Sequence, residues 1–135
     1  MNTRHELMRM SMTTIDYTAW AGRSTWSAVE AAHLICFQNP DKPTGDISTR
    51  VRKLMTVAGK YGAFALIGAD KDELASYCAS PATFLAWANL SGIDVPGDLA
   101  KAIAETGEAP DLGALQEAKN LMRAVLDMFQ AGAAH

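Results

Sequence analysis

Residues 80–92, SPATFLAWANLSG, contain the start, the body and the end of one helix. The hydroxyl of Ser80 can accept a hydrogen bond from the free N–H groups of a first helical turn, and Pro81 stands at the first helical position, where no N–H is needed. Gly92 suits the left-handed turn that ends a helix, and Ile93 is placed for the apolar contact that accompanies such a turn. The segment therefore predicts a helix over 81–91.

The same signal for a helix start recurs four times. A short oxygen-bearing side chain precedes an apolar run at Ser27, Asp46, Asp70 and Asp111. After Ser27 and Asp70, a Glu stands three residues later and can reach back to the N–H of the cap residue, which completes a capping box. The five starts together predict an all-α fold.

Apolar spacing supplies the rest of the expected architecture. It predicts a helical turn near 17–20 and helices over about 28–37, 47–58, 71–78, 81–91, 99–105 and 112–130. Residues 63–67, AFALI, fit a buried helix or a short strand, and helix is favoured because no second strand is evident to pair with them. The last helix carries one apolar stripe, widened on its flanks and ending before Gly132; it consists of Leu115, Ala118, Met122, Val125 and Phe129, with Leu121 and Leu126 beside it.

These elements predict a compact single-domain bundle of roughly five to seven mostly short helices with a longer C-terminal helix. The domain is expected over residues 15–132, after a flexible N-terminal tail at 1–14. With 135 residues, of which 49% are hydrophobic and 20% charged, the chain can bury a core without disulfides or metal. Cys36 and Cys78 are therefore expected to be core thiols of a reduced, cytoplasmic protein.

No part of the sequence indicates a membrane or a secretory address. No stretch approaches the ~20 uninterrupted apolar residues of a membrane span, and residues 1–12 lack the apolar centre of a signal peptide. We expect a cytoplasmic protein without a membrane partner.

The charge is divided unevenly along the chain. The net charge is −3, but residues 1–60 carry eight Lys or Arg and five Asp or Glu, whereas residues 61–135 carry four and ten. This balance does not favour nucleic acid as the main partner, and it favours partners that are steered to one end of the molecule. Candidate partner-binding residues in the acidic half are Asp94, Asp98, Glu105 and Glu108.

Candidate chemistry is sparse. His33 and Cys36 lie three residues apart, but a zinc site needs three or four ligands, and a Cys/His nucleophile pair needs an orienting third group. The acidic residues flank turns and helix starts, where capping and solvation explain them, and no phosphate-binding loop or hydrolase motif is present. The sequence predicts no metal, no cofactor and no catalysis.

Two features raise the alternative of a DNA-binding regulator. Residues 81–103 have the helix, glycine turn and helix of a helix-turn-helix, although the second helix offers Lys101 as its only base, against Asp98 and Glu105. A basic face is expected on the helix after Asp46, formed by Arg50, Arg52, Lys53 and Lys60. An ordinary helical hairpin and a solvated helix face are favoured for these features, because the charge of the second helix would be repelled by phosphates.

Two blocks of the sequence resemble a known group of proteins. WSAVEAAHL at 26–34, followed by Asn39-Pro40, resembles the W-[ST]-x-x-E-A-A-x-L opening of small, largely uncharacterised proteins carried by bacterial prophages and integrated elements. SPATFLAWA at 80–88, with Gly92 and Pro96 after it, is similar to their second block, SPxxFxxWAxxxGxxxP. The usual Gly after the first helix is replaced here by Cys36-Phe37-Gln38. The group has no common assigned activity, so the resemblance implies a shared structural core and no site.

We therefore expect a protein-binding accessory or inhibitor module of a bacterial mobile element, without catalysis of its own. One special case is an inhibitor of a host defence complex, whose acidic half would occupy a basic, nucleic-acid-binding surface. The alternative is the helix-turn-helix-like DNA-binding regulator. The wide apolar stripe on 112–129 leaves both a monomer and a homodimer open.

Overall fold

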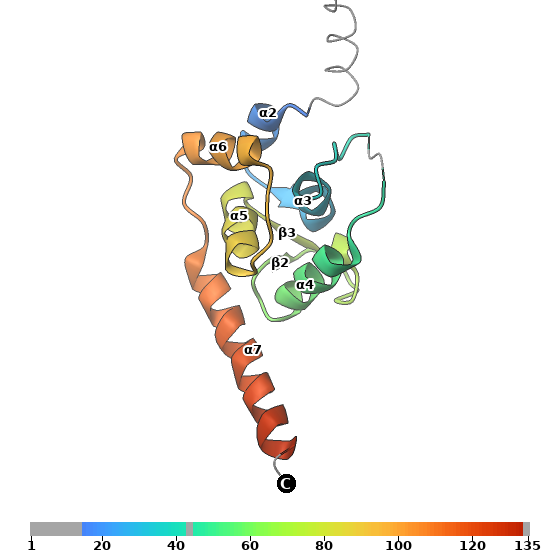
Figure 1. Ribbon diagram of the computed structural model, residues 1–135, viewed down its shortest axis with the longest axis vertical. Helices are drawn as coiled ribbons and strands as arrows, with labels where there is room; N and C mark the ends of the chain where they lie inside the picture. Colours follow the sequence, from blue (N-terminus) through green and yellow to red (C-terminus); the bar gives the residue numbers. More distant parts are fainter. Residues whose placement is uncertain (1–14, 43–44, 134–135) are drawn as a thin grey trace, which may run out of the picture.

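The computed structural model describes residues 15–42 and 45–133 of the chain, with side chains up to residue 128 (Figure 1). The elements are α2 (Tyr17–Ala21), β1 (Trp26–Ser27), α3 (Ala28–Ile35), α4 (Thr49–Lys60), β2 (Ala65–Leu66), a 3₁₀ turn η1 (Leu74–Ser76), β3 (Tyr77–Ala79), α5 (Pro81–Leu90), α6 (Gly97–Thr106) and α7 (Leu112–Ala133). The protein is therefore mostly helical, with a small sheet. The expected tail at 1–14 lies outside the described residues.

The sheet corrects the expectation of a strictly all-α fold. β3 is the central strand, and both of its neighbours run antiparallel to it, with Trp26 opposite Ala79 and Leu66 opposite Tyr77. The preference for helix at 63–67 is wrong, because Ala65 and Leu66 form β2. The partner strand comes from residues 77–79, a segment that the sequence pattern assigned to another helix.

The prediction of a helix over 71–78 is also wrong, and local hydrogen bonds explain why. The carboxylate of Asp70 accepts from the backbone N–H of Asp72 at 2.9 Å, which closes a turn instead of capping a helix. The phenol of Tyr77 donates to the carbonyl of Lys71 at 2.6 Å and fixes the far end of the same loop. Only the single 3₁₀ turn η1 remains before the chain extends into β3.

Three of the five expected caps are confirmed. Ser27 forms a complete capping box with Glu30, Ser80 accepts from the N–H of Thr83 at 3.2 Å, and the carboxylate of Asp111 accepts from the N–H of Ala114 at 3.1 Å. Asp46 does not cap α4. Ser48 takes this position instead, and the helix begins two residues later than expected.

An aromatic cluster forms the centre of the core. The ring centroids of Phe64 and Phe84 lie 4.6 Å apart, those of Phe64 and Trp87 lie 5.8 Å apart, and Trp26 stacks on Phe84 at 6.4 Å. All four side chains are buried, and they come from β1, α5 and the segment before β2.

None of the described helices combines the length and the apolar character needed to cross a membrane.

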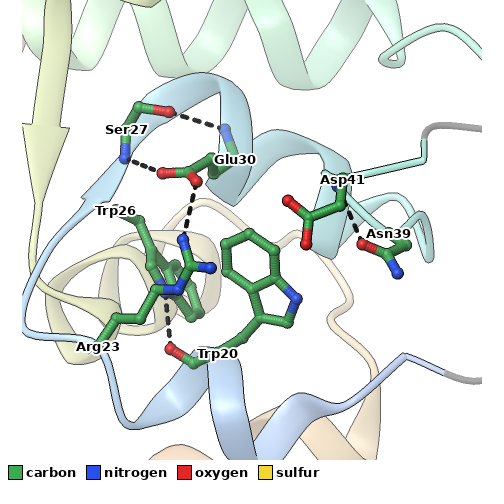
Figure 2. A network of polar contacts seen from close by, with 7 residues as sticks. All are labelled: Trp20, Arg23, Trp26, Ser27, Glu30, Asn39 and Asp41. Carbon is green, nitrogen blue, oxygen red and sulfur yellow. Dashed lines mark hydrogen bonds and ion pairs between the residues drawn. The ribbon is translucent and has the colours of Figure 1, made fainter.

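A polar network joins α2 to the start of α3 (Figure 2). The guanidinium of Arg23 lies 3.9 Å from the ring centre of Trp20 and pairs with the carboxylate of Glu30 at 3.2 Å. The second oxygen of Glu30 accepts from the N–H of Ser27 at 2.9 Å, so one carboxylate serves both the ion pair and the capping box. The indole of Trp26 donates to the carbonyl of Trp20 at 2.8 Å. Trp26, Ser27 and Glu30, the named residues of the W-S-x-x-E block, therefore each make a hydrogen bond that fixes this part of the fold.

Helices α3 and α5 end in the same kind of turn. At α5, the N–H of Ile93 bonds to the carbonyl of Ala88 at 2.9 Å, and Gly92 adopts φ +69°. At α3, the N–H of Gln38 bonds to the carbonyl of His33 at 2.8 Å, and the left-handed position is taken by Phe37 with φ +63°. Both turns are Schellman motifs, but only the turn after α5 has the glycine that this conformation favours.

Candidate protein-binding surfaces

An acidic groove lies between α2 and α6, at the end of the molecule shown at the top of Figure 1. It is an open groove with a volume of about 520 Å³, and it is lined by Ile15, Asp16, Tyr17, Thr18, Asp98, Lys101, Ala102 and Glu105. The spacing of the α6 residues explains their convergence, because residues three, four and seven apart lie on one face of a helix. The apolar Leu99 and Ile103 on the other side of α6 are buried in the core and orient this face outward.

The electrostatics of the groove are one-sided. Three carboxylates, those of Asp16, Asp98 and Glu105, line the groove with a single ammonium group from Lys101. One oxygen of Asp16 also caps α2, because it accepts from the backbone N–H of Ala19 at 3.0 Å. In the described ranges, the ion pairs are formed by Arg23 with Glu30 and by Lys60 with Asp72, so none of the groove carboxylates is neutralised by one. Burial, and then the charge of Asp98, raises the pKa of the Tyr17 phenol above its ordinary value of 10.0. At neutral pH the groove therefore presents negative charge around an uncharged phenol.

The groove brings together two of the four predicted acidic residues. Asp98 and Glu105 both line it, whereas Asp94 lies in the connection before α6 and Glu108 in the connection after it. Both connecting residues are exposed and lie outside the lining. The sequence pattern did not identify Asp16, and it did not place Tyr17, a possible partner anchor by its type, beside α6. Both positions come from a contact between helices that are remote in sequence.

The predicted basic residues of α4 project from one half of the helix, within an arc of about 160° at ~100° per residue. All four are exposed, but Lys60 is paired with Asp72. Arg50 and Lys53 lie three residues apart and are neighbours on the helix, whereas Arg52 is two residues from Arg50 and points to a different side. Arg50, Arg52 and Lys53 therefore give this half of α4 a net positive charge, with Arg50 and Arg52 at its two edges.

The segment predicted as a possible helix-turn-helix forms two helices, α5 and α6, which are joined by residues 91–96 (Figure 1). The face of α6 that would have to approach DNA is the face that lines the acidic groove beside α2. Its exposed charges are those of Asp98, Lys101 and Glu105, and a net negative helix is repelled by phosphates.

The structure gives the predicted metal and nucleophile candidates ordinary partners. The Nδ1 of His33 lies 3.1 Å from the side-chain oxygen of Gln38, and the amide nitrogen of Gln38 donates to the carbonyl of Asp46 at 3.1 Å. Cys36 and Cys78 are half-buried free thiols. Across the described residues, no three His, Cys, Asp or Glu side chains gather as a metal site would require.

A second surface lies at the other end of the molecule, around α7. An apolar pocket of about 180 Å³ opens between α4, α5 and α7; it is lined by Leu54, Ala58, Ala63, Trp87, Leu90, Ser91, Leu115, Ala118, Lys119 and Met122. Beyond this pocket α7 continues away from the other elements (Figure 1). Its Leu121, Leu126 and Met128 side chains are 51%, 56% and 74% exposed. We call the pocket together with this free half of the helix the α7 surface.

Comparisons of the chain with protein-family models, with curated proteins and with solved structures give no match.

Proposed function

We propose that this protein is a protein-binding module that performs no catalysis and recognises a basic partner surface through the groove between α2 and α6. The observation that carries the proposal is the set of carboxylates from Asp16, Asp98 and Glu105, which share one groove without an ion-pair partner among the described residues. Such a groove suits the guanidinium or ammonium groups of a partner, because hydrogen bonds between charged groups are the stronger ones. The neutral phenol of Tyr17 adds a donor and an apolar ring to the lining.

A basic protein surface that binds nucleic acid is the partner chemistry that fits best. Such surfaces carry clustered Lys and Arg side chains for phosphate contacts, and a protein carboxylate can occupy the same groups. The resemblance of the 26–34 and 80–96 blocks to proteins of prophages and integrated elements supports an accessory or inhibitor role in a mobile element. Within that role, we propose inhibition of a host nucleic-acid-binding complex as the specific case.

The test is capture of partners from nuclease-treated host lysate by the full chain and by a groove variant. The groove variant combines Glu105→Lys with Asp98→Asn, which keeps a helix-compatible polar residue in the first turn of α6. A matched control, Glu117→Lys with Glu73→Gln, makes the same change in net charge at exposed positions outside the groove and outside the α7 surface. We expect one stoichiometric protein that the wild type and the control retain and that the groove variant loses.

Two results would contradict this function. Equal capture by the groove variant and the control would show that the groove carboxylates do not bind the partner. Capture of nucleic acid alone, lost after nuclease or in high salt, would support the DNA-binding regulator instead, and the salt slope of binding should then become shallower when Arg50 or Lys53 is removed.

A further inference from the structure

The second half of α7 lacks a covering element in the described part of the chain. Residues 119–133 of the helix extend over about 22 Å, at 1.5 Å per residue, past the body to which Leu115 and Ala118 are packed (Figure 1). A helix of this length is marginal in water when nothing packs against it. The segment nevertheless carries an apolar stripe, so its sequence is suited to a packed environment.

The uncovered stripe continues the stripe that is already buried. Leu115, Ala118, Met122 and Val125 repeat at spacings of three and four, the pattern with which two helices pair along a seam. The first two are buried, and the next two are only partly covered. The apolar stripe of α7 therefore continues beyond the last residue that packs against the other helices.

The apolar pocket lies where the free half of α7 begins. Its volume of about 180 Å³ is comparable to a cavity of ~150 Å³ that holds a benzene-sized group, so it accommodates one large apolar side chain. The exposed Leu90, at the end of α5, extends its rim. Each chain therefore has an exposed apolar helix face and, beside it, an unfilled apolar pocket of the size of one large side chain.

Two copies related by a two-fold axis satisfy both requirements at once. If two α7 helices cross antiparallel at Arg123, Met128 of each helix lies level with Ala118 of the other and therefore beside the pocket. The same crossing brings Val125 level with Leu121, so Ala118, Leu121, Val125 and Met128, spaced three, four and three residues apart, form a seam that is symmetric about Arg123. The charge of Arg123 lies away from the seam, because at about 100° per residue Arg123 points roughly 180° away from the mean direction of Ala118, Leu121, Val125 and Met128.

We propose that the protein forms a symmetric homodimer in which the free halves of α7 pair antiparallel and each helix end covers the apolar pocket of the other copy. The occupant of the α7 surface is thus a second copy of this chain. Self-complementary contacts of this kind are the commonest route to closed dimers. The acidic groove lies at the opposite end of the molecule and stays free (Figure 1).

The test is sedimentation equilibrium of the full chain at micromolar concentration. We expect a dimer for the wild type. Leu121→Glu on the seam and Leu90→Glu at the pocket rim should each raise the dissociation constant about tenfold or more, because each places a charge in an apolar contact. Both residues are exposed in the single chain, so the fold should survive, which circular dichroism checks.

Asn120→Glu is the matched control, since it places the same charge one residue away on the exposed polar side of α7. It should leave the dissociation constant unchanged. A wild type that stays monomeric, or equal effects of Leu121→Glu and Asn120→Glu, would overturn the proposal. An unchanged dimer in Leu90→Glu would overturn the role of the pocket. These results are separable from the proposed function, because the Leu121→Glu monomer should still capture a partner of the acidic groove.

Discussion

Phe37 is the residue whose conformation departs most from what its type favours. It holds φ +63° at the end of α3, yet its side chain is 65% exposed. A left-handed residue other than glycine costs about 1–2 kcal/mol, and burial of the ring does not compensate for this cost. Strain of this kind concentrates at functional positions, which makes Phe37 a residue to probe in any partner complex.

The strain at Phe37 predicts that Phe37→Gly stabilises the protein. The expected gain in the free energy of unfolding is about 0.5–1 kcal/mol, after the extra entropy of glycine in the unfolded chain is subtracted. Phe37→Ala removes the same ring but keeps the strain, and it should be close to neutral. Urea denaturation of the three proteins measures both effects. A loss of stability in both variants would mean that the exposed ring makes contacts that the turn geometry does not reveal.

Two helical glycines should respond oppositely to alanine. At Gly59 in α4, an added Cβ would lie 2.8 Å from ring carbons of Tyr77, which is buried and cannot move aside. At Gly113 in α7, the nearest atom would be a carboxylate oxygen of Asp111 at 3.6 Å, an ordinary contact. Gly59→Ala should therefore cost about 1–2 kcal/mol through overpacking, and Gly113→Ala should gain a few tenths to about 1 kcal/mol through helix propensity. Thermal unfolding of both variants decides; a stabilising Gly59→Ala would contradict the close approach.

The phenol of Tyr77 links stability to alkaline pH. Burial raises its pKa above 10.0 in the folded protein, whereas the nearby Lys60 lowers it by a smaller amount. Because the unfolded chain loses this proton first, the contribution is fully present below pH 10.0 and decreases as pH rises above that value. Tyr77→Phe lacks the hydrogen bond to Lys71 and should cost about 0.5–1.5 kcal/mol at neutral pH. The difference in unfolding free energy between the wild type and Tyr77→Phe should become smaller at alkaline pH. A difference that does not change with pH would contradict a raised pKa of Tyr77.

At the scale of elements, Thr83 connects the starts of two helices. Its buried hydroxyl lies 2.8 Å from the hydroxyl of Ser80 and accepts from the backbone N–H of Asp111, ahead of α7, at 2.9 Å. Thr83→Val should cost about 1–2 kcal/mol, because it leaves polar groups at both helix starts without this partner.

Thr106→Val provides the control for Thr83. The hydroxyl of Thr106 donates to the carbonyl of Ile103 at 2.7 Å within the same helix end, beside solvent. Its loss should cost less than about 1 kcal/mol, since water can replace it. Equal unfolding free energies for the two variants would show that the link between α5 and α7 contributes nothing specific.

The elements that the sequence predicted correctly are those with local signals. The helix over 81–91 was predictable because Ser80, Pro81 and Gly92 each act within one turn of their own position. The strands were not, because Ala65 and Leu66 become β2 only when residues 77–79 arrive beside them. In the 70–76 loop, the turn closed by Asp70 competed with a capping box that has the same sequence pattern.

At the scale of the whole molecule, the candidate surfaces were likewise predictable only where their residues lie close together in sequence. The face that Asp98 and Glu105 share was readable from their spacing of seven residues. Asp16 was not, because only the packing of α2 on α6 brings it to the groove. The excess width of the α7 stripe was visible in the sequence, but the point at which the body stops covering it, between Ala118 and Leu121, is a property of the tertiary structure.

The proposed partner-binding groove and the proposed dimer interface lie at opposite ends of the molecule, and this separation predicts the effect of shortening α7. Truncation after Arg123 keeps Leu115 and Ala118, which pack on the body, and removes Leu126 and Met128, which the single chain leaves exposed. The truncated protein should fold, bind a partner through the acidic groove and no longer dimerise. Because dimerisation stabilises the folded state by mass action, the melting temperature of the wild type should rise with protein concentration, whereas that of the truncated chain should not. Calorimetry at two concentrations measures this. A concentration-independent melting temperature for the wild type would contradict a dimer, whereas an unfolded truncation product would mean that the outer half of α7 contributes to the fold of a single chain.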